Sequence, residues 1–275
     1  MSLQTIARKV SGAMGRETAL IRALRPWYER LLDLTTGGRG FRRRVNDDLE
    51  FWVDPRYRGY FPEVYEPPVY GFLRRNVQPG DVSLNVGAHM GIFAMTLAAT
   101  SAPSGIVYAF EPNPDTRRAL ESHIRRNGFE DAIRVVPTAV SDSVGDSSFF
   151  AAASHGFSRL GAPNPDRGEN HQEVSVKLTT IDEFCSSHNI SPRWIVMDIE
   201  GYEVAALRGA AETIRAGRVG LVIEMHPPLW KVSGSGREEM EELLAELNLI
   251  PVPLMEQADP LGEYGVVRLV RTDEL

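Results

Sequence analysis

Cysteine is almost absent from this chain of 275 residues, which has a single one, Cys185. One cysteine excludes an internal disulfide, and the histidines lack the spacing of a structural zinc site. The sequence also lacks the roughly 18 consecutive apolar residues of a membrane-spanning helix, and the apolar core and cleavage site of a signal peptide. We therefore predict a soluble, cytoplasmic protein in which Cys185 packs in the core as a small hydrophobic residue.

An excess of positive charge is also lacking. The formal net charge of −7 argues against broad affinity for nucleic acids, because binding to phosphates depends on clustered Lys and Arg. Residues 1–44 differ, since they hold ten basic and three acidic residues. This basic segment has three interpretations: it packs against the acidic remainder of the chain, docks an anionic substrate, or associates weakly with an anionic membrane surface.

The third feature that the sequence lacks is one glycine of the pattern that binds dinucleotides. Val82–Val86 is a short apolar run that predicts a buried strand, and it ends at Gly87, where the backbone can turn tightly. Gly91 then opens a predicted helix. The G-x-G-x-x-G pattern that binds a pyrophosphate needs another glycine, which this spacing lacks. The looser turn suits S-adenosylmethionine, which has no phosphate, and an NAD-type oxidoreductase on a similar sheet is the alternative.

A carboxylate is present where an adenosine cofactor needs one. The second apolar run, 106–110, ends in Glu111. A carboxylate at the end of this strand can accept hydrogen bonds from both hydroxyls of a ribose. The free N–H groups at the start of the helix after Gly91 favour a carboxylate-bearing ligand in the same place. The turn and Glu111 together predict an adenosine-binding site.

Four motifs stand in order along the chain: NVGAHMG at 85–91, FEPNP at 110–114, VMDIEGYE at 196–203 and IEMH at 223–226. Together they resemble the FkbM family of S-adenosylmethionine-dependent methyltransferases. The resemblance implies an α/β fold of the class I methyltransferase (Rossmann-like) type, with a seven-stranded, mostly parallel sheet. It also implies methylation of a hydroxyl on a small molecule or glycan, although nothing in the sequence identifies the acceptor.

The resemblance implies a set of cofactor-binding residues, which comprises Asn85, Gly87, Ala88, His89, Gly91, Glu111, Pro112, Asn113, Ala139, Val140 and Asp198. Two of them depart from the family pattern, because Asn85 replaces the usual Asp and His89 replaces the usual Asn. Asn85 can still hydrogen-bond, but it lacks the charge that attracts the ammonium group of the cofactor. Ala139 and Val140 follow the third strand, where the family has backbone contacts to adenine.

Apolar runs and helical segments alternate along the chain, which predicts right-handed crossovers and a parallel sheet. Predicted strands lie at 82–86, 106–110, 133–136, 147–151, 173–178, 194–198, 219–224, 251–255 and 266–270, and predicted helices at 91–100, 115–127, 203–216 and 236–247. Residues 5–34 have helical spacing, with Pro26 expected to kink or divide that helix. We predict a basic N-terminal helical extension and lead-in at 1–62 and a methyltransferase domain at 63–275.

Polar side chains at the ends of two strands are the predicted catalytic residues. Asp198 and Glu200 follow one apolar strand, and His226 follows the next. Ligands in open α/β sheets bind at the carboxyl ends of strands, and a carboxylate or histidine there can take a proton from the acceptor. The alternative interpretation is that the carboxylates only cap the next helix and the histidine is structural.

Two further interpretations stay open. Together with Glu224, these residues have the ligand chemistry for Mg²⁺ or Mn²⁺, but we do not favour a metal and predict no metal site. The polar segment 154–172 includes His155, Phe157, Ser158 and Arg159, and a loop of this length can serve as a substrate lid. A non-catalytic cofactor-binding or membrane-associated protein is the remaining alternative, and the oligomeric state is undetermined.

Overall fold

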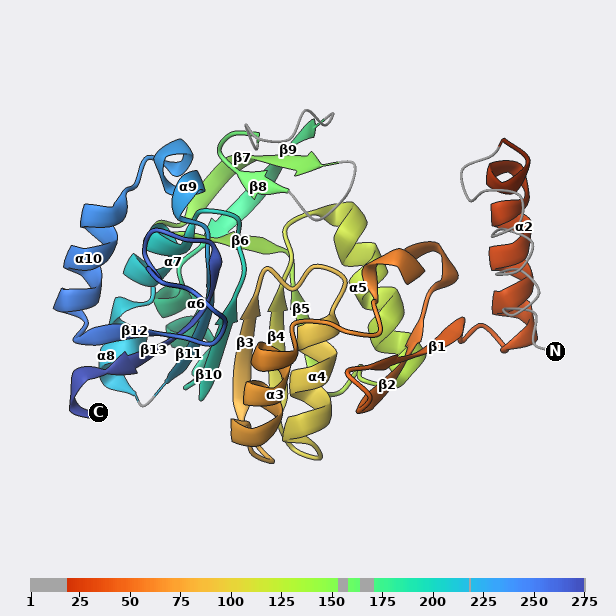
Figure 1. Cartoon of the computed structure of the whole chain (residues 1–275), viewed down its shortest axis with the longest axis horizontal. Helices are drawn as coiled ribbons and strands as arrows, with labels where there is room; N and C mark the ends of the chain where they lie inside the picture. Colours follow the sequence, from red (N-terminus) through yellow and green to blue (C-terminus); the bar gives the residue numbers. More distant parts are fainter. Residues whose placement is uncertain (1–18, 153–157, 164–170, 218, 275) are drawn as a thin grey trace. The chain divides into compact units, whose positions relative to one another are not determined.

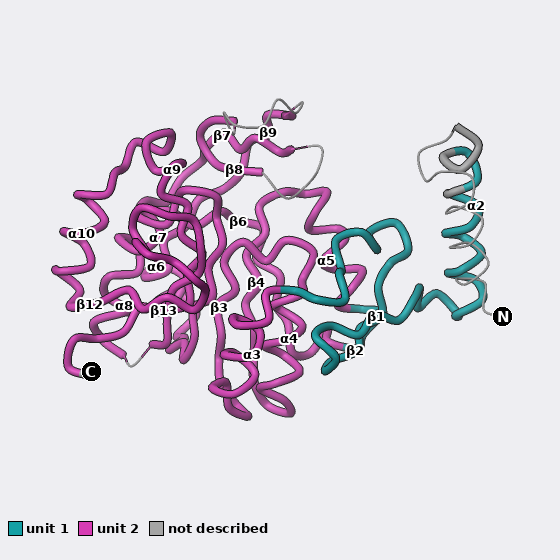
Figure 2. Tube along the Cα trace, viewed as in Figure 1, with its two compact units in different colours: residues 1–65, 125–128 teal, residues 66–124, 129–275 magenta. Residues whose placement is uncertain are grey.

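The computed structural model describes residues 19–152, 158–163, 171–217 and 219–274 (Figure 1). The chain divides into two compact units (Figure 2). The first consists of residues 1–65 together with 125–128, and the second consists of residues 66–124 and 129–275. None of the described helices is both long enough and apolar enough to cross a membrane.

The first unit contains a helix and a β-hairpin. Its elements are α2 (Ala19–Thr35), β1 (Phe41–Val45), β2 (Leu49–Val53) and the 3-10 helix η1 (Pro55–Tyr60). The hairpin turns at Asn46 and Asp47, which have φ values of 50° and 54°, a conformation that Asn and Asp tolerate better than most residues. Helix α2 runs through Pro26, so of the kink or division predicted there the division does not occur: the proline removes one N–H donor without ending the helix.

Helix α2 has a row of exposed apolar side chains. Leu24, Trp27, Leu31 and Leu34 are all exposed, and their spacing of three to four residues sets them along one face. Residues 1–18 lie outside the described residues, so the helix predicted to start at residue 5 is seen only in part. Association of the basic segment with a membrane stays a prediction.

The second unit is built on a seven-stranded sheet with the order β12-β13-β11-β10-β3-β4-β5. The strands are β3 (Val82–Val86), β4 (Ile106–Phe110), β5 (Ile133–Val136), β10 (Trp194–Met197), β11 (Gly220–Met225), β12 (Leu249–Pro253) and β13 (Gly265–Arg271). Strand β13 is antiparallel to both of its neighbours, whereas β5, β4, β3, β10 and β11 are parallel. The predicted seven-stranded, mostly parallel sheet is confirmed.

Helices pack around this sheet (Figure 1). They are α3 (Pro67–Asn76), α4 (Ile92–Ser101), α5 (Pro114–Asn127), α6 (Ile181–His188), α7 (Glu203–Arg208), α8 (Ala211–Ala216), α9 (Pro227–Trp230) and α10 (Arg237–Glu246), with short 3-10 turns η2 (Lys231–Ser233) and η3 (Thr272–Glu274). The single helix predicted over 203–216 is two helices. They separate at Gly209, where a Cβ atom would lie 2.2 Å from the carbonyl oxygen of Ser141. Cys185 is buried in the core, as predicted.

A smaller sheet stands at the carboxyl end of the large one. It has the order β6-β9-β7-β8, with β6 (Thr138–Val140), β7 (Gly145–Ala152), β8 (Arg159–Leu160) and β9 (His171–Thr179). Strands β7 and β9 correspond to the runs predicted at 147–151 and 173–178. His155 and Phe157, two of the predicted lid residues, lie outside the described residues, whereas Ser158 and Arg159 lie within them.

Candidate active site

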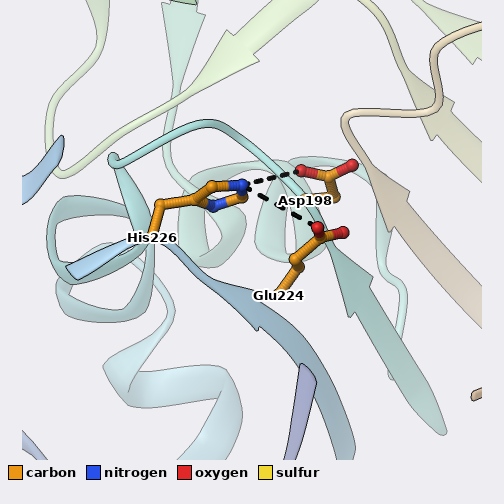
Figure 3. Close-up of side chains that lie close together, drawn as sticks. All are labelled: Asp198, Glu224 and His226. Atoms are coloured by element: carbon orange, nitrogen blue, oxygen red, sulfur yellow. Dashed lines mark ion pairs between the residues drawn. The ribbon is translucent and has the colours of Figure 1, made fainter. Parts of the chain in front are cut away.

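The register of two parallel strands brings the predicted catalytic residues together. Met197 of β10 is level with Ile223 of β11, so Asp198 and Glu224 come next at the same height. His226 is the residue directly after the end of β11. Figure 3 shows the His226 ring directed at the carboxylates of Asp198 and Glu224. The pairing of the strands therefore explains why side chains far apart in sequence meet.

His226 lies in a ring of four carboxylates. Its Nδ1 is 2.9 Å from Oε1 of Glu203. Its Nε2 lies 3.8 Å from Oε2 of Glu200 and 3.9 Å from both Oδ1 of Asp198 and Oε1 of Glu224. Because Glu203 accepts the hydrogen bond from Nδ1, the opposite nitrogen faces the other three carboxylates. The predicted residues Asp198, Glu200 and His226 thus form one cluster.

Glu203 is the central residue that the sequence interpretation missed. Its side chain is fully buried, and its carboxylate accepts three hydrogen bonds. The donors are the backbone N–H of Gly201 at 2.9 Å, Nδ1 of His226 at 2.9 Å and Nε1 of Trp230 at 2.7 Å. In the sequence, Glu203 stood out only as the last residue of the VMDIEGYE motif. The pattern around it predicted the first residue of a helix and no contact with His226.

The cluster shifts the acidity of its members. Burial opposes charge on His226, but the hydrogen bond to Glu203 and the neighbouring negative charges raise the pKa of His226 to about 10. Burial, offset in part by His226, raises the pKa of Glu200 to about 7. Burial and the charge of Glu224 raise the pKa of Asp198 well above its usual range. The imidazole is therefore the cation of the site, and Asp198 and Glu200 hold protons more readily than in water.

Asp198 has one enclosed and one open side. The side chain is 40% exposed, yet its Oδ1, which faces His226, is buried and has no hydrogen-bond partner within the described part of the chain. On the far side of the cluster, the hydroxyl of Tyr264 donates to Oε1 of Glu224, and the Tyr264 ring is 5.4 Å from the His226 ring. Tyr264 precedes β13 and was not predicted, since no local pattern marks it.

Three groups lie near enough to share a cation. Asp198, Glu224 and His226 each offer one ligand atom, and these three atoms lie within 4.8 Å of one another. Oxygen and imidazole ligands at this spacing match the coordination of a divalent ion. Binding would require the loss of the proton on Nε2 of His226, which the surrounding carboxylates stabilise. A metal ion and protonated His226 are therefore alternatives for the same charge.

The predicted cofactor turn lies against this cluster. Gly87 has φ 80°, and a Cβ atom there would be 1.8 Å from the carbonyl oxygen of Asp198. The N–H groups of Gly87 and Ala88 both donate to the carbonyl of Phe110, at 3.1 and 2.9 Å. Gly91 has φ 99° and caps α4. Only glycine at position 87 permits this close approach between the turn and the end of β10.

Glu111 stands beside the same turn. Its side chain is buried, its Oε2 accepts from the backbone N–H of His89 at 2.8 Å, and its Oε1 accepts from that of Asn113 at 2.9 Å. Burial, opposed by these two hydrogen bonds, raises the pKa of Glu111 to about 7. Each carboxylate oxygen keeps a second lone pair for a ligand hydroxyl. Pro112 lies between Glu111 and Asn113, and the Asn113 amide lies 3.4 Å from Oγ of Ser158.

Asn85 and the segment 139–140 complete the predicted cofactor residues. Asn85 is buried in β3, and its Nδ2 is 3.4 Å from the carbonyl of Val196. Its Oδ1 has no hydrogen-bond partner among the residues that the structure describes. Ala139 and Val140 lie in β6, at the edge of the small sheet. The structure thus brings the turn, Glu111 and Asn113 together, with Asn85 in the adjoining strand.

A parallel sheet with one antiparallel strand inserted between β11 and β12, and polar residues at the carboxyl ends of its central strands, defines a class I methyltransferase. The model of the FkbM methyltransferase domain matches residues 85–250. The chain belongs to this family and is an S-adenosylmethionine-dependent methyltransferase. The comparisons give no support to the oxidoreductase and non-catalytic alternatives.

Similar proteins include the hexuronic acid methyltransferase AglP of Haloferax volcanii, 27% identical over 214 residues, which are 77% of this chain and 79% of that protein. Among solved structures, methyltransferase FkbM from Methylobacillus flagellatus has a TM-score of 0.47 at 17% identity. The match covers 69% of this chain but only 43% of that one. Fibrillarin from Aeropyrum pernix, with bound S-adenosyl-L-methionine, has a TM-score of 0.43 at 12% identity over 74% of this chain and 73% of that one.

Proposed function

We propose that this enzyme methylates a hydroxyl oxygen of a sugar acceptor, and that Asp198 takes the proton. The observation that carries the proposal is the contact between the cofactor turn and the carboxylate cluster, where Gly87 lies against the backbone of Asp198. This contact supports a site in which the cofactor and the candidate base meet at one point of the sheet. The hexuronic acid acceptor named for AglP supports a sugar.

The residues around the turn fit S-adenosylmethionine. Glu111 would hold the ribose hydroxyls, and the amide groups that open α4 would hold the carboxylate. The unpartnered Oδ1 of Asn85 is an acceptor for an N–H donor. The backbone of Ala139 and Val140 is available for adenine. When bound, the cofactor supplies a methyl group on a positively charged sulfur, already activated for displacement.

The protein then has to align the acceptor and remove one proton. During methyl transfer, the carboxylate of Asp198 would take the proton of the acceptor hydroxyl. Burial and Glu224 raise the pKa of Asp198, which makes its carboxylate a stronger base, while the charge on His226 favours its ionised form. His226 acts as a cation that Glu203 holds in place, and Glu200 adds to the same network.

Protonated His226 supplies the counter-charge that a metal ion would otherwise bring. We therefore expect catalytic activity to persist after exhaustive treatment with EDTA and dialysis into metal-free buffer. The measurement is the initial rate with and without added Mg²⁺ or Mn²⁺, alongside elemental analysis of the protein. Loss of activity on chelation, with recovery on adding one of these ions, would assign the trio of Asp198, Glu224 and His226 as a metal site instead.

Glu111 provides a test of the cofactor site by itself. Glu111→Gln keeps the size and one acceptor oxygen but loses the charge, and its amide then faces one of the two backbone N–H donors. We expect the affinity for S-adenosylhomocysteine to fall about tenfold, the equivalent of about 1.4 kcal/mol. Isothermal titration measures this, with the exposed Glu130→Gln as control. Unchanged affinity in Glu111→Gln would remove Glu111 from the cofactor site.

The acceptor is tested with a panel of compounds and S-adenosylmethionine labelled in its methyl group. The panel contains neutral sugars, hexuronic acids and non-sugar alcohols, and NMR identifies the methylated oxygen. We expect label in a sugar as a methyl ether, which resists mild base, whereas a methyl ester is cleaved. Transfer only to non-sugar alcohols, or only to a carboxylate, would contradict the proposal.

A further inference from the structure

Arg159 is a buried cation with no counter-ion among the residues that the structure describes. The side chain is 1% exposed, and the hydrogen bond that it makes to the described residues runs from Nη2 to the carbonyl of Leu229 at 3.5 Å. Its Nε and Nη1 are buried and have no hydrogen-bond partner in the described chain. No described carboxylate lies within ion-pair distance of it. Two N–H-bearing nitrogens of one guanidinium are therefore available.

Such an arrangement is unfavourable unless a partner arrives. Removing a charge from water costs several kcal/mol even after the protein relaxes, and each buried donor without an acceptor adds to that cost. Within the protein the guanidinium is compensated only weakly, through the face of Tyr202 at 5.9 Å and the more distant charges of Glu200 and Glu203. Glu203 already accepts three hydrogen bonds, so it is not a free partner.

Arg159 also lies close to the carboxylate cluster around His226. Leu229, its hydrogen-bond acceptor, is in α9, directly after His226. Gly161, the residue that follows β8, lies so close to Tyr202 that a Cβ atom there would be 2.1 Å from the Tyr202 hydroxyl oxygen. Tyr202 in turn sits in the segment between Glu200 and α7. The unpaired donors are therefore next to the loop that carries the catalytic carboxylates.

We propose that Arg159 binds the carboxylate of an acidic sugar acceptor, so that the substrates are hexuronic acids rather than neutral sugars. The inference rests on the proposed methylation of a sugar hydroxyl and assigns a residue to its specificity. Two adjacent N–H groups of a guanidinium match the two oxygens of a carboxylate, and here the second hydrogen of Nη2 would form such a pair with Nε or with Nη1. A phosphate dianion fits less well, because the charges of Glu200 and Glu203 also act at the Arg159 guanidinium and would repel a second negative charge.

The test compares methyl glucuronide with methyl glucoside, which differ in the carboxylate. We expect Arg159→Gln to lower kcat/KM for the glucuronide by about 30-fold, mostly through KM, and to leave kcat/KM for the glucoside within about twofold. Arg159→Lys should recover part of the loss, because it keeps the charge but not the fork. The exposed Arg134→Gln is the matched control, and unchanged affinity for S-adenosylhomocysteine shows that the Arg159 variants are folded.

Equal losses with both sugars, or no loss with either, would overturn the assignment. If neither sugar is methylated, the proposed function fails by itself, and the anion site is judged by calorimetry. Glucuronate and glucose are then titrated into the enzyme saturated with S-adenosylhomocysteine. Binding of glucuronate alone, weakened in Arg159→Gln, supports the site independently of catalysis, and equal or absent binding of the two sugars refutes it.

Discussion

Asp198→Asn is expected to lower kcat by about 10³-fold, within the range that a positioned general base contributes. Asparagine has nearly the same shape but cannot take a proton from the acceptor hydroxyl. The close contact between Gly87 and residue 198 involves the backbone carbonyl, so it survives the substitution. The affinity for S-adenosylhomocysteine should therefore stay within about threefold, equivalent to less than 1 kcal/mol. Single-turnover kinetics with labelled cofactor measure the chemical step directly.

The exposed Asp131→Asn is the matched control and should behave like the natural enzyme. A fall in cofactor affinity as large as the fall in kcat would show that Asp198 binds rather than reacts. Retention of kcat within about threefold would mean that another group takes the proton, since removal of a true base costs at least about 10²-fold. Glu200→Gln then becomes the informative variant, because Glu200 also faces Nε2 of His226.

The sequence predicted the parts of this site that follow directly from the end of an apolar run. Asp198, His226 and Glu111 each come within one or two residues of a buried strand, and parallel strands end at the same edge of a sheet. Glu203 and Tyr264 could not be found in this way. Their importance depends on which side chains the folded chain sets against them, namely His226 for one and Glu224 for the other.

The errors in the predicted fold likewise concern features that have no clear local pattern in the sequence. The hairpin of the first unit was missed because β1 contains three consecutive arginines between Phe41 and Val45, which hide the alternation of a strand. The break lies at Gly209, where a Cβ atom would meet the carbonyl oxygen of Ser141, 68 residues earlier in the chain and beyond any local pattern. The sequence marked Arg159 as one of several residues of a polar loop, and only tertiary structure reveals that it is buried with no counter-ion in the described part of the chain.

Glu203→Gln is expected to disrupt the site through His226. One oxygen of glutamine can accept from Gly201 and His226, but its amide then faces the Nε1–H of Trp230, a donor against a donor. Loss of this buried charge should lower the free energy of unfolding by about 3 kcal/mol and kcat by about 10²-fold. Urea denaturation and steady-state kinetics measure the two effects, with the exposed Glu238→Gln as control.

The pH dependence separates this role of Glu203 from simple packing. In the natural enzyme the pKa of His226 is raised to about 10 from an ordinary 6.5, so the native state holds one more proton than the unfolded state between these values. The stabilisation is complete below pH 6.5 and is lost as pH rises through 10, at about 1.4 kcal/mol per pH unit. Glu203→Gln removes the charged partner that contributes most to the raised pKa of His226. The slope of stability against pH should therefore flatten, and the NMR titration of His226 should move toward neutral pH. An equal slope in both proteins, or an unmoved titration, would show that Glu203 only fills space and that Asp198 and Glu200 alone keep His226 charged.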